Sequence, residues 1–209
     1  MSVAAARVEL HRPLPPEEAA RGDFYALLGR LAYSAPDQAL LSALANAEPI
    51  PPSGDGELSR AWEALSRASS AMDTDAAAEE YEALFIGMGK APVSLYAGYY
   101  IGAPAADHPR VRLRADLAAF GLGWREENTE PEDHLAALFE VMRVLVAGGR
   151  GRDPAPIAEQ KRFFEAFLAV GAREFFLAMA RAEKANYYRR VAGLGLAFLA
   201  IEAESFELD

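Results

Sequence analysis

Acidic and histidine side chains gather where a strongly apolar segment begins. Glu130, Asp133 and His134 belong to the turn EPEDH at 130–134, and the apolar segment 135–147 follows it. An Asp–His pair can work as a general acid and base, so a small all-α hydrolase that uses Asp133 and His134 is one interpretation. No nucleophile motif accompanies the pair, and a helix cap that contains a hydrogen-bonded histidine is the plainer interpretation.

The sequence lacks the common catalytic and cofactor motifs. It contains no GxxxxGK[ST], no GxGxxG that opens a helix and no GxSxG. A di-iron bundle needs Glu-x-x-His on two helices, but none of His11, His108 and His134 has a glutamate three residues before it. The absence of cysteine excludes disulfides, thiolate metal sites and a cysteine nucleophile. We therefore expect a protein without enzymatic activity, metal or cofactor.

The charge balance indicates the kind of partner. The 209 residues include 21 basic and 31 acidic side chains, which gives a formal charge of −10. A nucleic-acid-binding protein needs a basic surface, so that class is disfavoured. An acidic surface suits a cationic partner, although it also serves plain solubility. No secretory signal and no apolar run of roughly 18 residues is visible, so we expect a cytoplasmic protein.

Apolar residues recur at helical spacing along most of the chain, which predicts an all-α, single-domain bundle of eight to ten helices. The clearest stripe consists of Leu135, Leu138, Phe139, Met142, Leu145 and Val146. A second stripe near the C-terminus consists of Tyr187, Val191, Leu194, Phe198 and Ile201. We expect a flexible arm over residues 1–16 and a helical domain over 17–209, with a flexible Gly/Pro-rich linker near 148–156.

Further helices are expected from local patterns. Residues 108–120 should form one, with Val111, Leu113, Leu117 and Phe120 facing inward. Residues 155–170 and 172–183 should form two more, because Gly171 allows a turn between them. Pro131 suits a first helical position, so the helix that carries the first stripe should begin near the turn 130–134.

Aromatic residues cluster around one region that is hard to assign to a regular element. This set consists of Tyr81, Phe85, Tyr96, Tyr99, Tyr100 and Trp124. The residues are either core or the wall of a groove for an apolar peptide. Acidic side chains at the rim of such a groove would favour a ligand that carries arginine, because a guanidinium can hold a carboxylate with two hydrogen bonds.

Three blocks of sequence together resemble the TorD/DmsD family of redox-enzyme maturation chaperones. The blocks are YEALFIG at 81–87, PVSLY at 92–96 and EPEDH at 130–134. They are similar to the family's aromatic-x-x-Leu-Phe-x-Gly segment, its Pro…Ser-aromatic loop and its Glu-Pro-x-Asp-His turn. The nitrate-reductase branch of the family lacks the last turn, so the resemblance disfavours that branch. Relatives often carry tryptophans around the first two blocks, where this chain has tyrosines.

The resemblance implies a cytoplasmic, TorD-like helical chaperone. Such a chaperone binds the twin-arginine signal peptide or N-terminus of a molybdenum-cofactor oxidoreductase subunit and holds it for cofactor insertion before export. The peptide-binding residues that it implies, together with the aromatic cluster, are Tyr81, Leu84, Phe85, Ser94, Tyr96, Trp124, Glu130, Asp133 and His134. Some members bind guanine nucleotide or molybdenum cofactor, and these remain the alternatives to the expectation of no cofactor.

Two other function classes stay open beside the chaperone. One is the hydrolase described above, and the other is an acidic helical scaffold protein that binds a folded partner through its whole acidic face. A monomer is expected. The linker 148–156 could let the last helices exchange between two copies, so a domain-swapped dimer is the alternative.

Overall fold

The structure is a computed structural model that describes residues 14–52, 54, 56–87, 91–102, 109–123, 131–149 and 151–208. These residues form helices joined by loops, and their only extended pairings are two isolated bridges. The elements are α1 (Pro16–Tyr33), α2 (Gln38–Ala45), α3 (Glu57–Ala71), α4 (Thr74–Tyr81), the π-helix η1 (Glu82–Ile86), α5 (Gly98–Ile101), α6 (Pro109–Ala119), α7 (Leu135–Ala147), α8 (Ile157–Phe163), the π-helix η3 (Phe164–Ala172), α9 (Arg173–Arg181) and α10 (Tyr187–Leu208).

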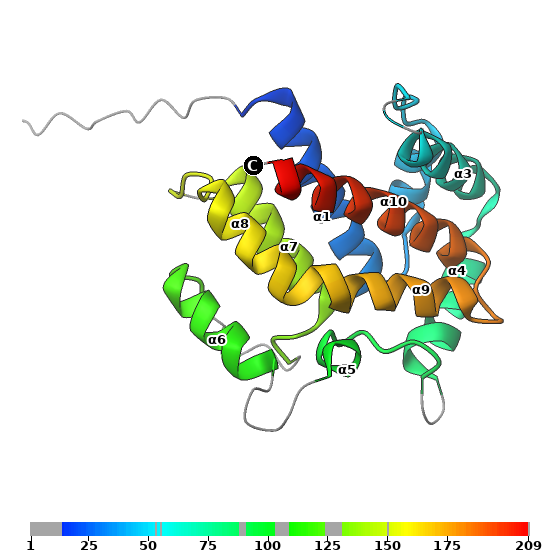
Figure 1. Ribbon diagram of the computed structural model, residues 1–209. Helices are drawn as coiled ribbons and strands as arrows, with labels where there is room; N and C mark the ends of the chain where they lie inside the picture. Colours follow the sequence, from blue (N-terminus) through cyan, green and yellow to red (C-terminus); the bar gives the residue numbers. More distant parts are fainter. Residues whose placement is uncertain are drawn as a thin grey trace, which may run out of the picture.

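The predicted all-α fold is confirmed. Helix α4 continues directly into η1, and α8, η3 and α9 form one continuous helix. Counted in this way, the described residues form nine helices, which agrees with the predicted eight to ten. Figure 1 shows them as one bundle, with α10, α7 and the α8–η3–α9 helix side by side and α6 set apart at one edge. Among the described residues, no helix is long and apolar enough to cross a membrane.

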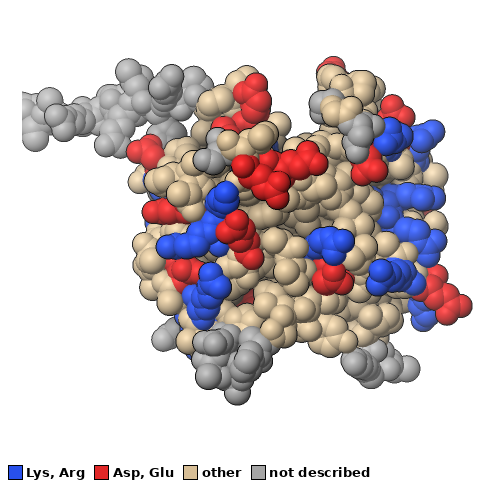
Figure 2. Space-filling view, viewed as in Figure 1, with Lys and Arg blue, Asp and Glu red and all other residues tan. Residues whose placement is uncertain are grey.

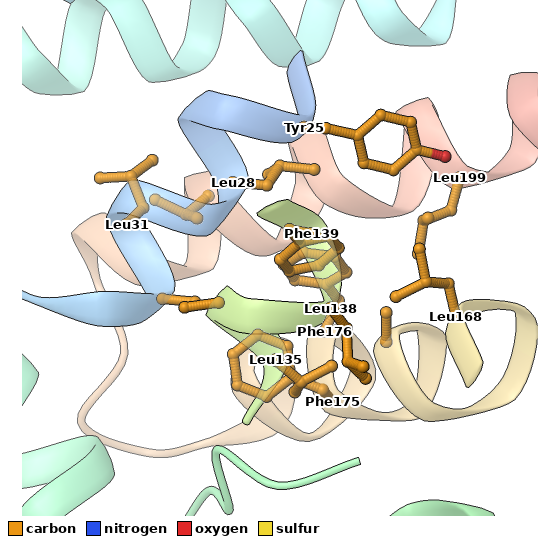
Figure 3. Close-up of a cluster of buried hydrophobic side chains, with 14 of the residues drawn as sticks. Tyr25, Leu28, Leu31, Leu135, Leu138, Phe139, Leu168, Phe175, Phe176 and Leu199 are labelled. Carbon is orange, nitrogen blue, oxygen red and sulfur yellow. The ribbon is translucent and has the colours of Figure 1, made fainter. Parts of the chain in front are cut away.

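Helix α7 lies at the centre of the bundle. All six residues of its predicted stripe are completely buried. Helix α1 packs closely along it, because Gly22 and Gly29 bring the two backbones together: a Cβ at Gly22 would lie 3.1 Å from Ala147 Cβ. In Figure 3 the ring of Phe139 lies among side chains from α1 and the C-terminal helices. The apolar spacing of α7 therefore organises the core around it.

Helix α7 begins later than predicted. Pro131 is not in its first turn, because residues 131–134 form a separate turn and α7 starts at Leu135. His134 occupies the N-cap position, and its Nδ1 accepts a hydrogen bond of 3.2 Å from the backbone N–H of Ala136. The plainer interpretation of this histidine, a helix cap, is thus confirmed.

The stripe of α10 is confirmed except at its end. Tyr187, Val191, Leu194 and Phe198 are buried, but Ile201 is 39% exposed and the neighbouring Glu202 is only 1% exposed. Glu202 lies four residues beyond Phe198 on the inner face, where Arg21 and Tyr25 of α1 provide polar partners. A hydrogen-bonded carboxylate therefore takes the inward position that the pattern assigned to isoleucine.

Helix α10 offers a matched pair of glycines for a stability test. A Cβ at Gly195 would overlap the buried ring of Phe176, whereas a Cβ at Gly193 would meet nothing within 4 Å. We expect Gly195→Ala to lower the free energy of unfolding by about 1–3 kcal/mol through overpacking. Gly193→Ala should raise it by about 0.5–1 kcal/mol because alanine favours helix. Urea unfolding of both variants measures this, and equal effects would contradict the packing of α10 on α9.

The predicted turn at Gly171 is wrong. The chain continues as helix from Ile157 to Arg181, with π-helical geometry around Gly171. The glycine instead permits close packing of the short helix α5, since a Cβ there would lie 3.0 Å from Ala97 Cβ and 3.3 Å from Ile101. Gly171 therefore serves contact between helices rather than chain reversal.

Helix α6 packs with one face against α8 and η3. Leu113, Leu117 and Phe120 are buried as predicted, and the Phe120 ring meets Phe163 edge-on at 6.1 Å. The prediction for Val111 is wrong, because its side chain is 64% exposed. Val111 lies two residues from Leu113, which is half a turn of helix, so the two side chains cannot face the same way.

Candidate functional site

The two loop regions singled out in the sequence lie against each other. The N–H of Leu135 donates to the Leu95 carbonyl at 2.8 Å, and the N–H of Ala97 donates to the Asp133 carbonyl at 2.9 Å. Between these bonds Tyr96 and His134 form an isolated antiparallel bridge, with their rings edge-to-face at 5.5 Å. The segment 91–97 is therefore fixed to the start of α7.

Tyr100 stabilises the same segment from within. Its hydroxyl donates to the Ser94 carbonyl at 2.9 Å and accepts from the Ser94 N–H at 3.0 Å. Ser94 Oγ in turn accepts a hydrogen bond from the N–H of Tyr96. Burial raises the pKa of Tyr100 to about 12, so its hydroxyl keeps its proton at neutral pH. These bonds hold Ser94 and Tyr96 in a defined position.

A cleft of about 890 Å³ opens beside this segment. Its lining comes from the end of α1, from the end of α4 and η1, from the segment 91–99 and from the cap of α7: Tyr33, Ser34, Tyr81, Phe85, Ile86, Ala91, Val93, Ser94, Leu95, Tyr96, Tyr99 and His134. The volume is in the range of sites that bind small ligands or peptide side chains. Five of the predicted site residues, Tyr81, Phe85, Ser94, Tyr96 and His134, are thus brought together.

Three large apolar side chains of the cleft are exposed to solvent. Tyr33 is 67% exposed, and Ile86 and Tyr99 are each 61% exposed. Exposed apolar groups that gather in a concave site are typical of binding surfaces. The predicted site residues did not include them. Tyr99 was visible in the aromatic cluster, and Ile86 belongs to the block 81–87, but no local signal connects Tyr33 with either.

Tyr81 and Phe85 form the inner wall of the cleft. Both are 7% exposed, and their ring centroids are 4.9 Å apart. The Tyr81 hydroxyl donates to the carbonyls of Ala32 and Tyr33, at 3.1 and 2.8 Å, which ties the end of α4 to the end of α1. The π-helical geometry of η1, a form found often at functional sites, ends at Gly87 with φ of 49°, a value that glycine adopts readily.

Two predicted site residues lie behind the cleft rather than in its lining. Leu84 is fully buried in the core. Asp133 is 2% exposed, and its carboxylate forms an ion pair of 2.8 Å with Arg110 of α6 and accepts from the N–H of Gly98 at 3.2 Å. The expectation that Asp133 stands at the rim of the groove is therefore corrected: it positions the segment around Gly98 and the turn before α7.

The neighbouring carboxylate is neutralised in the same way. Glu132 forms an ion pair of 2.6 Å with Arg114, one helical turn after Arg110. The hydrogen bond from Arg114 lowers the pKa of Glu132, so this carboxyl is ionised at neutral pH. Both arginines are considerably more exposed than the carboxylates they contact. No acidic residue belongs to the described lining of the cleft.

The arrangement of Asp133 and His134 does not resemble a catalytic pair. In such a pair the carboxylate orients the histidine through one ring nitrogen. Here His134 Nδ1 accepts the Ala136 N–H, while the Asp133 carboxylate contacts Arg110 and Gly98. The geometry therefore gives the hydrolase interpretation no support. Trp124 and Glu130, the other two predicted site residues, lie outside the described residues.

Comparison with known proteins identifies the family. A family model described as nitrate reductase delta subunit matches residues 52–176, which is more than half of the 209 residues. A crystal structure described as that of a proposed redox enzyme maturation protein from Archaeoglobus fulgidus matches with a TM-score of 0.56. It is 22% identical and covers 93% of this chain and 99% of its own, which shows a shared fold. The search of curated proteins found no match.

The family model covers the first two motif blocks and the Glu-Pro-x-Asp-His turn. Since its description names the nitrate reductase delta subunit, it gives no support to the expectation that the nitrate-reductase branch fits less well. The family is one of maturation chaperones rather than of catalytic enzymes. The chain therefore belongs to the TorD/DmsD family of redox-enzyme maturation chaperones.

Proposed function

We propose that this chaperone binds the twin-arginine signal peptide or N-terminus of a molybdenum-cofactor oxidoreductase subunit. It holds that precursor in the cytoplasm until the cofactor is inserted, and then releases it for export. The observation that carries the proposal is the gathering of exposed Tyr33, Ile86 and Tyr99 in one cleft of about 890 Å³. The chaperone acts as a monomer and needs no cofactor of its own.

The apolar lining suits the hydrophobic part of a signal peptide. Burial of apolar surface contributes about 25 cal/mol per Å², from which the cost of ordering the peptide must be subtracted. The protein itself needs little ordering on binding, because Tyr100 and the bridge between Tyr96 and His134 already fix the walls of the cleft. A pre-formed wall of aromatic and aliphatic groups accepts many apolar sequences without demanding one.

Selection of the arginines requires carboxylates. Glu132 and Asp133, beside the cleft, are largely buried and each contacts an exposed guanidinium of α6. A guanidinium of the signal peptide can take the place of Arg110 or Arg114 without leaving a buried carboxylate unpaired, which would be costly. In this proposal α6 holds the acidic groups in a neutralised state until the client arrives.

Calorimetric titration with two synthetic leader peptides tests the proposal. One peptide carries the twin arginines, and the matched control carries lysines in their place. We expect saturable binding of the first and a loss of about tenfold or more for the second, because lysine cannot form the two-pronged contact with a carboxylate. Equal affinity for the two peptides would remove the arginine selection, and absence of saturation with either would remove the proposed function.

A further inference from the structure

A second concave site lies between α3 and α10 and shares no lining residue with the cleft. It has a volume of about 530 Å³ and is lined by Ala64, Arg67, Ala68, Ala71, Met72, Asn186, Tyr187 and Arg190. Beneath it the hydroxyl groups of Ser69 and Tyr187, both buried, are hydrogen-bonded at 3.1 Å. Neither the family motifs nor the proposed function gives this pocket a role.

Two arginines line this pocket, one from each of its two helices. Arg67 belongs to α3 and Arg190 to α10, and within the described part of the chain neither has a carboxylate partner. Arg143 and Arg173 differ from them, since Arg143 pairs with Glu140 at 2.7 Å and Arg173 with Glu174 at 2.9 Å. In a chain of charge −10, two unpaired cations in one pocket favour an anion there.

The positive charge continues beyond the pocket. Arg181, Lys184 and Arg189 lie on the end of α9, the turn that follows and the first turn of α10. The guanidinium of Arg189 donates to the carbonyls of Ala180 and Ala182, which leaves its charge uncompensated by any acid. Figure 2 shows Lys and Arg gathered along the edge of the molecule where Figure 1 places α3 and the junction of α9 with α10. The turn between α9 and α10 also contains one acidic residue, Glu183.

The start of α10 itself does not offer a binding site for this anion. Its first backbone N–H groups are already taken by Glu80 of α4, whose carboxylate accepts from Asn186, Tyr187 and Tyr188 at 2.8–3.0 Å. The affinity for an anion must therefore come from the side chains of the basic face, which we define as Arg67, Arg181, Lys184, Arg189 and Arg190.

We propose that the basic face binds an acidic segment of a partner polypeptide, with an acidic side chain seated between Arg67 and Arg190. An extended segment fits better than a single small anion, because the cations lie on three helices and the turn between α9 and α10, and only Arg67 and Arg190 line the pocket. The interaction is independent of the cleft and supplies a second contact with a client or assembly partner. The partner segment is acidic, whereas the leader peptide carries arginines, so the basic face would attract the segment and repel the leader.

Fluorescence anisotropy with a labelled poly-glutamate peptide tests the proposal on the full chain. We expect saturable binding at about 50 mM salt that weakens at higher salt, as for any contact between exposed charges. Arg67→Glu/Arg190→Glu should weaken this binding by about tenfold or more. The matched control Arg143→Glu/Arg173→Glu changes the net charge equally and should change the affinity by less than about twofold, since those arginines already pair with glutamates.

Three outcomes would overturn the proposal. The first is absence of saturable binding by the wild-type chain. The second is an equal loss in both double variants, which would mean that only net charge matters. The third is complete displacement of the peptide by inorganic pyrophosphate that itself binds more tightly, which would make the pocket a site for a small anion. The leader-peptide titration with Arg67→Glu/Arg190→Glu should be unchanged, so failure here is separate from failure at the cleft.

Discussion

Ile86→Ser/Tyr99→Ser should bind a twin-arginine leader peptide about a hundredfold more weakly than the wild-type chain, if each side chain contributes roughly 1.4 kcal/mol. Both side chains line the cleft and are 61% exposed in the free protein. A bound apolar segment would cover them, so their truncation removes apolar area that is buried only in the complex. Aromatic and large aliphatic groups in concave sites usually dominate binding energy.

Their exposure makes this variant easier to interpret than one at Tyr81 or Phe85. Those two rings are buried and pack on each other and on Tyr188, so their loss would also affect folding. Substitution of exposed Ile86 and Tyr99 should change the free energy of unfolding by less than about 0.5 kcal/mol each. The measurement is calorimetric titration, with thermal unfolding to show that the fold is intact.

Val111→Ser/Val170→Ser is the control for this variant. Both valines are at least half exposed, and neither lines the cleft. Peptide affinity should remain within about twofold of wild type, because a general loss of surface hydrophobicity has no specific effect on binding. If the cleft variant kept its affinity, or if the control lost as much, the cleft would not be the peptide site.

Glu202→Ala is expected to destabilise the fold by about 3–5 kcal/mol, the usual cost of breaking a buried ion pair from one side. Glu202 is 1% exposed and receives two hydrogen bonds from Arg21, at 2.7 and 2.9 Å, and one from the Tyr25 hydroxyl at 2.7 Å. Its removal leaves Tyr25 without an acceptor and Arg21 with only the partly exposed Glu18. These contacts join α1 to α10 across 181 residues of sequence.

The pKa shifts around Glu202 agree with this. Burial acts to lower the pKa of Arg21, but the hydrogen bond and charge of Glu202 outweigh it, so that pKa is raised. Burial, followed by the charge of Glu202, raises the pKa of Tyr25 well above its usual value. Arg21 therefore stays charged and Tyr25 stays neutral at neutral pH, and both need the carboxylate as an acceptor.

Glu140→Ala provides the comparison for Glu202→Ala, since Glu140 pairs with Arg143 on the surface three residues along the same helix. Surface pairs of this kind contribute about 0–1 kcal/mol. In urea unfolding, Glu202→Ala should therefore lower the free energy of unfolding several-fold more than Glu140→Ala does. A loss below about 1 kcal/mol for Glu202→Ala would show that the carboxylate is not the required link between α1 and α10.

Much of the helical architecture was predictable because helix formation and amphipathic spacing are local. The stripe in α7 was correct at every position. The errors at Gly171 and Ile201 share one cause. Each residue was judged by its own propensity, whereas its surroundings are set by α5 and by Arg21, which are far away in the sequence.

The candidate site was predictable in composition but not in detail. The motif blocks identified Tyr81, Phe85, Ser94, Tyr96 and His134, all of which line the cleft. The blocks could not separate these residues from Leu84 and Asp133, because a motif records which residues occur together and not which of them reach the surface. Leu84 supports the wall of the cleft from the core, and Asp133 forms an ion pair with Arg110 of α6.

The sequence by itself determined the helical class, the buried face of α7 and the motif that marks the family, since each is written in short-range spacing. The tertiary structure alone decided which side chains meet across long separations. It joined Tyr33 to Ile86 and Tyr99, gave α10 a cap from Glu80, and turned Glu132 and Asp133 toward the arginines of α6. The physical reason is that such contacts depend on how whole helices pack, which no local pattern of residues specifies.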